Sequence, residues 1–144
     1  MIWINSWREP LPQHALMSQD AFPYQLLGAA DGVRALVERF YQLMERSPQY
    51  AGLRKLHRND LSQTKELLFQ FLSGWLGGPN LYFQGPGHRC VMSAHRNIAI
   101  GAEEVEQWLG CMNAALEDTD LEKGMRDQIS LGLSRFANRM RNKN

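Results

Sequence analysis

The chain has 144 residues, of which 44% are hydrophobic and 22% charged, and its formal net charge is +1. This composition predicts one globular domain with an apolar core and excludes an intrinsically disordered chain. The small net charge gives no basic field for nucleic acid, and no uncharged stretch is long enough to span a membrane. The N-terminus lacks the pattern of a secretory signal, and two cysteines form no disulfide framework, so we expect a cytoplasmic protein.

Hydrophobic residues recur at helical spacing along most of the chain, and no segment shows the alternation of a strand. The pattern predicts helices over residues 24–30, 32–46, 61–76, 102–117 and 121–141. Asp31 and Asp60 are the expected N-caps of the second and third of these, Asp60 pairing with Gln63 in a capping box, and Gly77 ends the third. The predicted inward faces of the four long helices carry Val33, Leu36, Val37, Phe40, Tyr41 and Met44; Leu61, Thr64, Leu68, Phe71 and Trp75; Val105, Trp108, Leu109, Met112 and Leu116; Met125, Ile129, Leu133, Phe136, Ala137 and Met140.

Two parts of the chain lack this periodicity. Residues 1–20 form an expected N-terminal extension before a domain over residues 21–144. Trp3 and Trp7 in this extension either pack on the domain or on a partner, or belong to a loosely ordered terminus. Residues 80–101 are rich in glycine and proline, and a loop of this length within a compact domain is usually functional or wraps a bound group.

Two polar aromatic side chains, Tyr41 and Trp108, lie on predicted inward faces. An unpaired buried donor costs about 1–3 kcal/mol, so each side chain needs a partner. Either one alone is usually a satisfied core residue, whereas both together indicate a cavity that holds something to bond. The histidine spacings match no hydrolytic zinc motif, and the chain has no nucleophile elbow or phosphate-binding loop. Periodicity therefore predicts an α-helical domain with an apolar cavity.

A further set of motifs follows in order along the chain. These are Phe40-Tyr41, residues 53–57 (LRKLH), Asp60-Leu61, residues 71–79 (FLSGWLGGP), Gly87-His88, His95 and residues 108–112 (WLGCM). In this order and spacing they resemble truncated haemoglobins of the second group, the bacterial two-over-two globins, over about residues 24–142. The resemblance implies an all-α two-over-two helical sandwich enclosing haem b. The haem would be held without covalent attachment, because no C-x-x-C-H motif occurs.

The resemblance also implies the residues of a haem site. His95 matches the proximal ligand, which bonds iron through a neutral imidazole. Tyr41, His57 and Trp108 match the polar positions of the distal pocket that stabilise a bound ligand. The implied haem-pocket residues are Thr64, Leu68, Phe71, Met92, Ile98 and Ile100.

The residues around His95 depart from the family pattern. Ala94 stands where a basic residue is common, and Arg96-Asn97-Ile98 replaces the usual x-Pro-Phe. The haem propionates therefore need other partners, for which Arg89, Arg96 and Lys65 are candidates.

The function implied is reversible binding of O₂, NO or CO at a pentacoordinate iron. Donors from Tyr41 and Trp108 would slow O₂ release, with His57 joining directly or through water. A donor-rich pocket suits chemistry on O₂ better than its delivery. Oxidation of nitric oxide and reduction of peroxide or peroxynitrite therefore stay open as enzyme activities, with an unidentified reductase as partner.

The alternatives are a gas or redox sensor and a haem-free helical interaction protein. We expect a monomer or a weak homodimer without a nucleic-acid or membrane partner.

Overall fold

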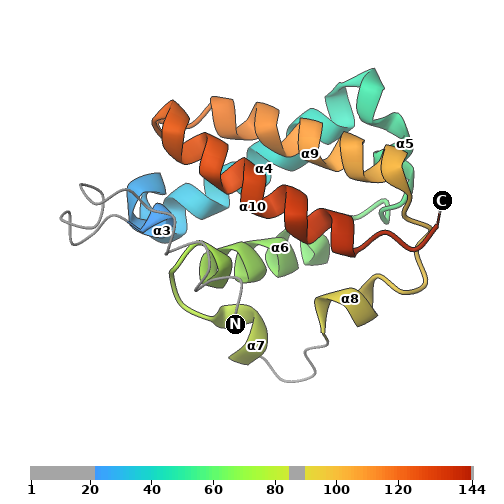
Figure 1. Cartoon of the computed structure of the whole chain (residues 1–144), viewed down its shortest axis with the longest axis horizontal. Helices are drawn as coiled ribbons and strands as arrows, with labels where there is room; N and C mark the ends of the chain where they lie inside the picture. The colour runs from blue at the N-terminus through green and yellow to red at the C-terminus, as the bar shows by residue number, and fades with distance from the viewer. Residues whose placement is uncertain (1–21, 85–89, 144) are drawn as a thin grey trace.

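The structure is a computed structural model that describes residues 22–84 and 90–143, and all regular structure within these ranges is helical (Figure 1). The elements are α3 (Pro23–Leu27), α4 (Ala29–Arg46), the 3₁₀ helix η1 (Pro48–Tyr50), α5 (Ala51–Lys55), α6 (Ser62–Trp75), α7 (Leu81–Gln84), α8 (Val91–Ala94), α9 (Ala102–Glu117) and α10 (Lys123–Arg139). None of these helices has the length and apolar character needed to cross a membrane. The predicted extension with Trp3 and Trp7 lies outside the described residues.

The core forms where the four long helices meet. α4 packs against both α6 and α9, and α9 packs against α10. α10 also reaches α6, because Gly132 lies against the ring of Trp75. The largest fully buried side chains come from all four helices and include Phe40, Met44, Leu72, Trp75, Met112, Leu116, Ile129 and Leu133. Each such burial contributes roughly 1.5–3 kcal/mol, so the sandwich is held mainly by its apolar helix faces.

α4 buries all six side chains of its predicted inward face. The expected N-cap at Asp31 is wrong, because α4 begins at Ala29. Gly28 adopts a left-handed conformation with φ 110° and turns α3 directly into α4. Asp31 therefore lies in the first turn, where its charge still complements the positive end of the helix.

α6 (Ser62–Trp75) is one residue shorter at each end than predicted, and its N-cap differs from the prediction, whereas the predicted stop at the glycine pair agrees. Its N-cap is Leu61, so the predicted capping box of Asp60 and Gln63 is wrong. Asp60 instead accepts hydrogen bonds from the backbone N and Oγ of Ser62, at 3.0 and 2.7 Å. At the other end, Gly77 has φ 100°, and Gly78 N donates to Ser73 O over 2.8 Å. This bond closes the helix as the glycine pair predicts.

Gly32, in the first turn of α4, is expected to be intolerant of any side chain. A Cβ at this position would overlap the carbonyl group of Leu27. We expect Gly32→Ala to lower the free energy of unfolding by about 1–3 kcal/mol, because the α3–α4 corner must shift. Urea titration followed by circular dichroism measures this change. Gly124→Ala is the matched control, since nothing lies within 4 Å of its Cβ. Equal stability of the two variants would contradict the prediction.

Candidate functional site

His95 lies directly after α8, a single helical turn inside the stretch predicted to be irregular. Its Nδ1 is 2.7 Å from the carbonyl oxygen of Val91. Because a carbonyl oxygen only accepts hydrogen bonds, Nδ1 carries the proton, and Nε2 of the neutral ring keeps its lone pair. Metal-ligating histidines are commonly oriented in this way, by a bond from the nitrogen that does not face the metal. The side chain of His95 is half-buried.

Three polar side chains, from α4, α9 and the segment between α5 and α6, are linked by ring contacts through Phe40 and Tyr41. The ring centroid of Phe40 lies 4.9 Å from that of Tyr41 and 5.4 Å from that of Trp108. The ring of His57, from the segment between α5 and α6, lies 5.8 Å from that of Tyr41. The structure thus brings together the three residues that the resemblance placed in the distal pocket.

Trp108 is less buried than its helix pattern predicts. Tyr41 is only 3% exposed, whereas Trp108 is partly exposed. The reason is that Trp108 bridges two apolar clusters, the main core and a small cluster of Ile100, Val105 and Ala137, and so lies at the edge of both.

Burial keeps the hydroxyl of Tyr41 protonated. It raises the pKa of Tyr41 far above the ordinary value, and the neighbouring Cys111 adds to the increase. Burial also raises the pKa of the Cys111 thiol to about 12. This thiol donates a hydrogen bond to the carbonyl oxygen of Phe40 over 3.2 Å. Tyr41 is therefore a hydrogen-bond donor at neutral pH, and Cys111 is a protonated packing residue beneath it.

His57 is oriented by its own backbone in the same way as His95. Its Nδ1 lies 3.0 Å from the carbonyl oxygen of Leu53, so Nδ1 carries the proton and Nε2 is an acceptor. Partial burial lowers the pKa of His57, the bond to Leu53 opposes this shift, and the positive charge of Arg54 adds to it. The neutral ring has no proton on Nε2 with which to donate directly to a ligand. This tautomer favours the second of the two roles expected for His57, an interaction with the ligand through water.

The implied haem-pocket residues occupy different environments. Thr64 and Leu68 are half-buried on α6, and Phe71 is buried one turn further along. The ring of Phe71 lies 5.0 Å from Phe136 and 6.0 Å from Tyr82. The remaining three lie near His95: Met92 is 50% exposed, Ile98 is half-buried, and Ile100 belongs to the small cluster with Val105.

His95 as a single protein ligand suits a metal that is already coordinated by a cofactor. The described residues contain no group of three or more His, Cys, Asp or Glu side chains placed to hold a bare metal ion. Haem iron already has four porphyrin nitrogens and needs only one imidazole from the protein.

Partly buried apolar side chains at the edges of the two clusters also fit a flat, hydrophobic group. Leu68, Val91 and Trp108 are only partly buried at the border of the main core, and Ile98 is partly buried at the border of the small cluster. A bound porphyrin covers surfaces of this kind. The residues present therefore fit haem.

The three candidate propionate partners are placed differently. Lys65 Nζ already pairs with Glu38 over 3.0 Å. Arg96 is exposed directly after His95 and donates to Ser93 Oγ over 3.3 Å. Arg89 lies outside the described residues.

Two polar residues of the site were not predicted from the sequence. Gln107 Oε1 accepts a hydrogen bond from Leu53 N over 2.9 Å and so ties α5 to α9 beside Trp108. Asn142 lies after α10 and bonds to the segment that follows His95. Both bonds join a side chain to a backbone group more than 40 residues away, and a single sequence has no pattern that reveals such pairs.

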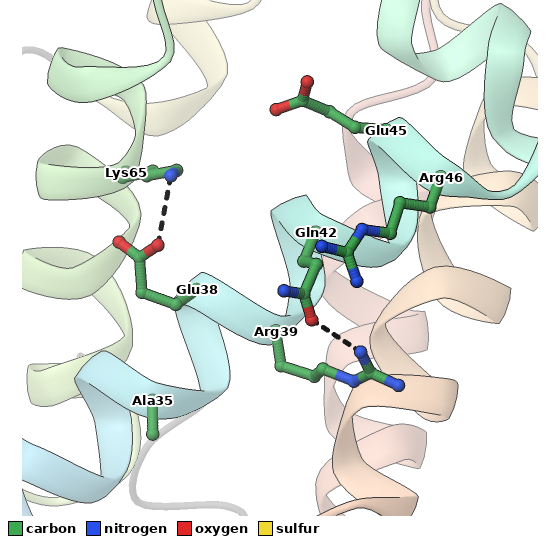
Figure 2. A pocket seen from close by; sticks show the side chains of 7 residues that line it. All are labelled: Ala35, Glu38, Arg39, Gln42, Glu45, Arg46 and Lys65. Carbon is green, nitrogen blue, oxygen red and sulfur yellow. Dashed lines mark hydrogen bonds and ion pairs between the residues drawn. The ribbon is translucent and has the colours of Figure 1, made fainter.

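A groove of about 680 Å³ lies elsewhere, along the polar side of α4 (Figure 2). It is lined by Ala35, Glu38, Arg39, Gln42, Glu45, Arg46 and Lys65. Lys65 of α6 bonds to Glu38 of α4, and within α4 Arg39 Nη1 donates to Gln42 Oε1 over 2.6 Å. These polar walls do not suit an apolar group, so the groove is separate from the site around His95.

Comparison with known proteins now defines the class of protein. A model of the bacterial-like globin family matches residues 23–142. A group 2 truncated hemoglobin of Bacillus subtilis is 33% identical over 105 residues, which cover 73% of this chain and 76% of that protein. The chain belongs to the bacterial-like globin family.

Solved structures agree with this assignment. The cold-adapted truncated hemoglobin of the Antarctic marine bacterium Pseudoalteromonas haloplanktis has a TM-score of 0.81 and 31% identity, over 85% of this chain and 99% of that chain. The group II 2-on-2 hemoglobin of Agrobacterium tumefaciens has a TM-score of 0.80 and 34% identity, over 85% and 95% of the two chains. The predicted two-over-two fold and the resemblance to the second group are confirmed. In general terms, the function of this family is haem-based binding of small gas molecules.

Proposed function

We propose that the protein holds haem b through His95 and reversibly binds O₂, NO or CO in the pocket of Tyr41, His57 and Trp108. The observation that carries this proposal is the bond from His95 Nδ1 to Val91 O, which leaves Nε2 available as an iron ligand. When bound, haem supplies an iron atom with one open coordination position.

The proposed distal pocket contains two hydrogen-bond donors and one acceptor. The hydroxyl of Tyr41 stays protonated because burial raises its pKa, and the indole nitrogen of Trp108 can only donate. Both therefore stabilise a ligand that bears partial negative charge. Neutral His57 offers Nε2 as an acceptor, which orients a water molecule or a protonated ligand.

A second candidate function is turnover of nitric oxide, peroxide or peroxynitrite. The observation that favours it is the neutral His57, whose Nε2 accepts a proton from an incoming peroxide. Oxidation of nitric oxide would require a reductase as partner to return the iron to its ferrous form, and reduction of peroxide or peroxynitrite would require an electron donor. Gas or redox sensing is the same binding without turnover, and stopped-flow mixing with nitric oxide or peroxide separates the two.

The cellular setting we propose is the cytoplasm, with a monomer or weak homodimer as the assembly. Both cysteines are free, Cys90 on the surface and Cys111 in the core, which suits a reducing compartment. Analytical ultracentrifugation measures the assembly.

Optical spectroscopy tests the proposal directly. We expect the purified protein to take up one equivalent of hemin and to give distinct ferric, ferrous and CO-bound spectra, because one imidazole and an apolar surface are placed to bind haem. Hemin in buffer alone is the control. A protein that stays colourless after mixing with hemin would contradict the proposal and favour a haem-free interaction protein.

A further inference from the structure

The C-terminal tail runs beside the segment that joins α8 to α9 (Figure 1). In this tail, the side-chain amide of Asn142 forms hydrogen bonds through both its oxygen and its nitrogen. Its Oδ1 accepts from Ile100 N over 2.8 Å, and its Nδ2 donates to Ile98 O over 2.7 Å. Nδ2 also lies 3.5 Å from His95 O, a weak contact. The backbone N of Asn142 donates to Ile100 O over 2.8 Å, so one residue fixes most of residues 95–100.

The segment held in this way has little structure of its own. α8 is one turn long, and residues 97–101 belong to no helix. Ile100 is anchored in the small cluster with Val105 and Ala137, and Asn142 ties the remainder of the segment to the end of α10. The segment begins at His95, so its placement decides where the imidazole points.

Next to Asn142, the backbone N of Lys143 also donates to Ile100 O, over 3.1 Å, but the side chain of Lys143 adds little to this attachment. Its Nζ lies 3.4 Å from Glu104 Oε1, and its side chain is 48% exposed. An ion pair this exposed is weak. The Asn142 amide, by contrast, offers a donor nitrogen and a separate acceptor oxygen to two backbone groups at once.

We infer that Asn142 is a positioning residue for the haem site, which holds the backbone of residues 95–100 against α10 and thereby orients His95. This inference rests on the proposed function, because its consequence is retention of haem.

The test compares Asn142→Ala with Asn138→Ala as the matched control. Asn138 lies one turn earlier and donates only to Ser134 O of its own helix, over 2.8 Å. Two measurements are needed: hydrogen exchange of the Ile100 amide in the haem-free protein, and the rate of haem transfer to excess apomyoglobin from the loaded protein. For Asn142→Ala we expect both rates to rise about tenfold, because the side-chain hydrogen bonds to Ile98 O and Ile100 N are lost. Asn138→Ala should leave both unchanged.

Asn142→Asp separates the two ends of the amide. It keeps the acceptor for Ile100 N and loses the donor to Ile98 O, so we expect the Ile100 amide to stay protected while haem loss accelerates. The iron–histidine stretching frequency, measured by resonance Raman spectroscopy, should shift from its wild-type value in both variants at position 142 and stay unchanged in Asn138→Ala.

Each outcome has a defined meaning. Unchanged haem loss and an unchanged stretching frequency in Asn142→Ala would overturn the inference while leaving the proposed function intact. A wild-type protein that takes up no haem would overturn both. Faster haem loss in Asn138→Ala as well would assign the effect to general loosening of α10 and overturn the role of Asn142.

Discussion

Replacing His95 by alanine is expected to abolish stable haem uptake. Nε2 of His95 is the single protein ligand proposed for the iron, and the loss of a residue that merely orients a metal ligand already weakens metal binding about 10- to 100-fold. We therefore expect at least a loss of about a hundredfold in haem affinity, measured by the Soret absorbance after titration with hemin.

The matched control for this variant is His57→Ala, on the distal side. His57 is half-buried and its Nδ1 is likewise bonded to its own backbone, so the two substitutions remove similar groups. His57→Ala should retain haem, and added imidazole should restore part of the Soret band in His95→Ala. A full-strength band in His95→Ala without imidazole would contradict the ligand assignment.

Replacing Tyr41 by phenylalanine is expected to accelerate O₂ release about 10- to 100-fold. The variant keeps the buried ring beside Phe40 and removes only the hydroxyl. A donor to a charged group contributes about 1.5–3 kcal/mol, and each 1.4 kcal/mol changes affinity about tenfold. Displacement of O₂ by CO in a stopped-flow instrument measures the rate.

Two further variants test whether this effect is specific to the pocket. Trp108→Leu should accelerate release less than Tyr41→Phe, because Trp108 is partly exposed and water can replace its donor. Tyr24→Phe removes a hydroxyl from another buried tyrosine, on α3 against Gly78, and should leave release unchanged. If neither Tyr41→Phe nor Trp108→Leu alters the rate of O₂ release, the proposal that hydrogen-bond donors stabilise the ligand is wrong.

Sequence reasoning predicts best the helices in which hydrophobic residues recur regularly at helical spacing. α4 has six apolar or aromatic residues at helical spacing, and every one of them is buried. On α6 and α9, which border the proposed site, the hydrophobic pattern predicts burial less accurately. Leu68 and Trp108 lie on the predicted inward faces, yet both are only partly buried. A surface reserved for a cofactor has the same period as a core and cannot be told from it by pattern alone.

The parts that sequence reasoning misses depend on local geometry or distant backbone groups. The N-cap of α4 is displaced because the conformation of Gly28, rather than the charge of Asp31, sets the start of the helix. The tautomer of His57 depends on a carbonyl one turn earlier, and Asn142 meets a segment more than 40 residues away. Periodicity pointed to Tyr41 and Trp108 as buried polar residues, and only the motif resemblance supplied His95, His57 and the roles proposed for all four.

In the haem site that we propose, the partner of His95 Nδ1 would affect the redox state of the iron. Val91 supplies a neutral carbonyl where some metal-bound histidines have a carboxylate. A carboxylate would draw the Nδ1 proton and give the imidazole anionic character, which favours the more highly charged iron. A carbonyl would leave the ring close to neutral, so the peptide backbone would favour the ferrous state, the one that takes up O₂.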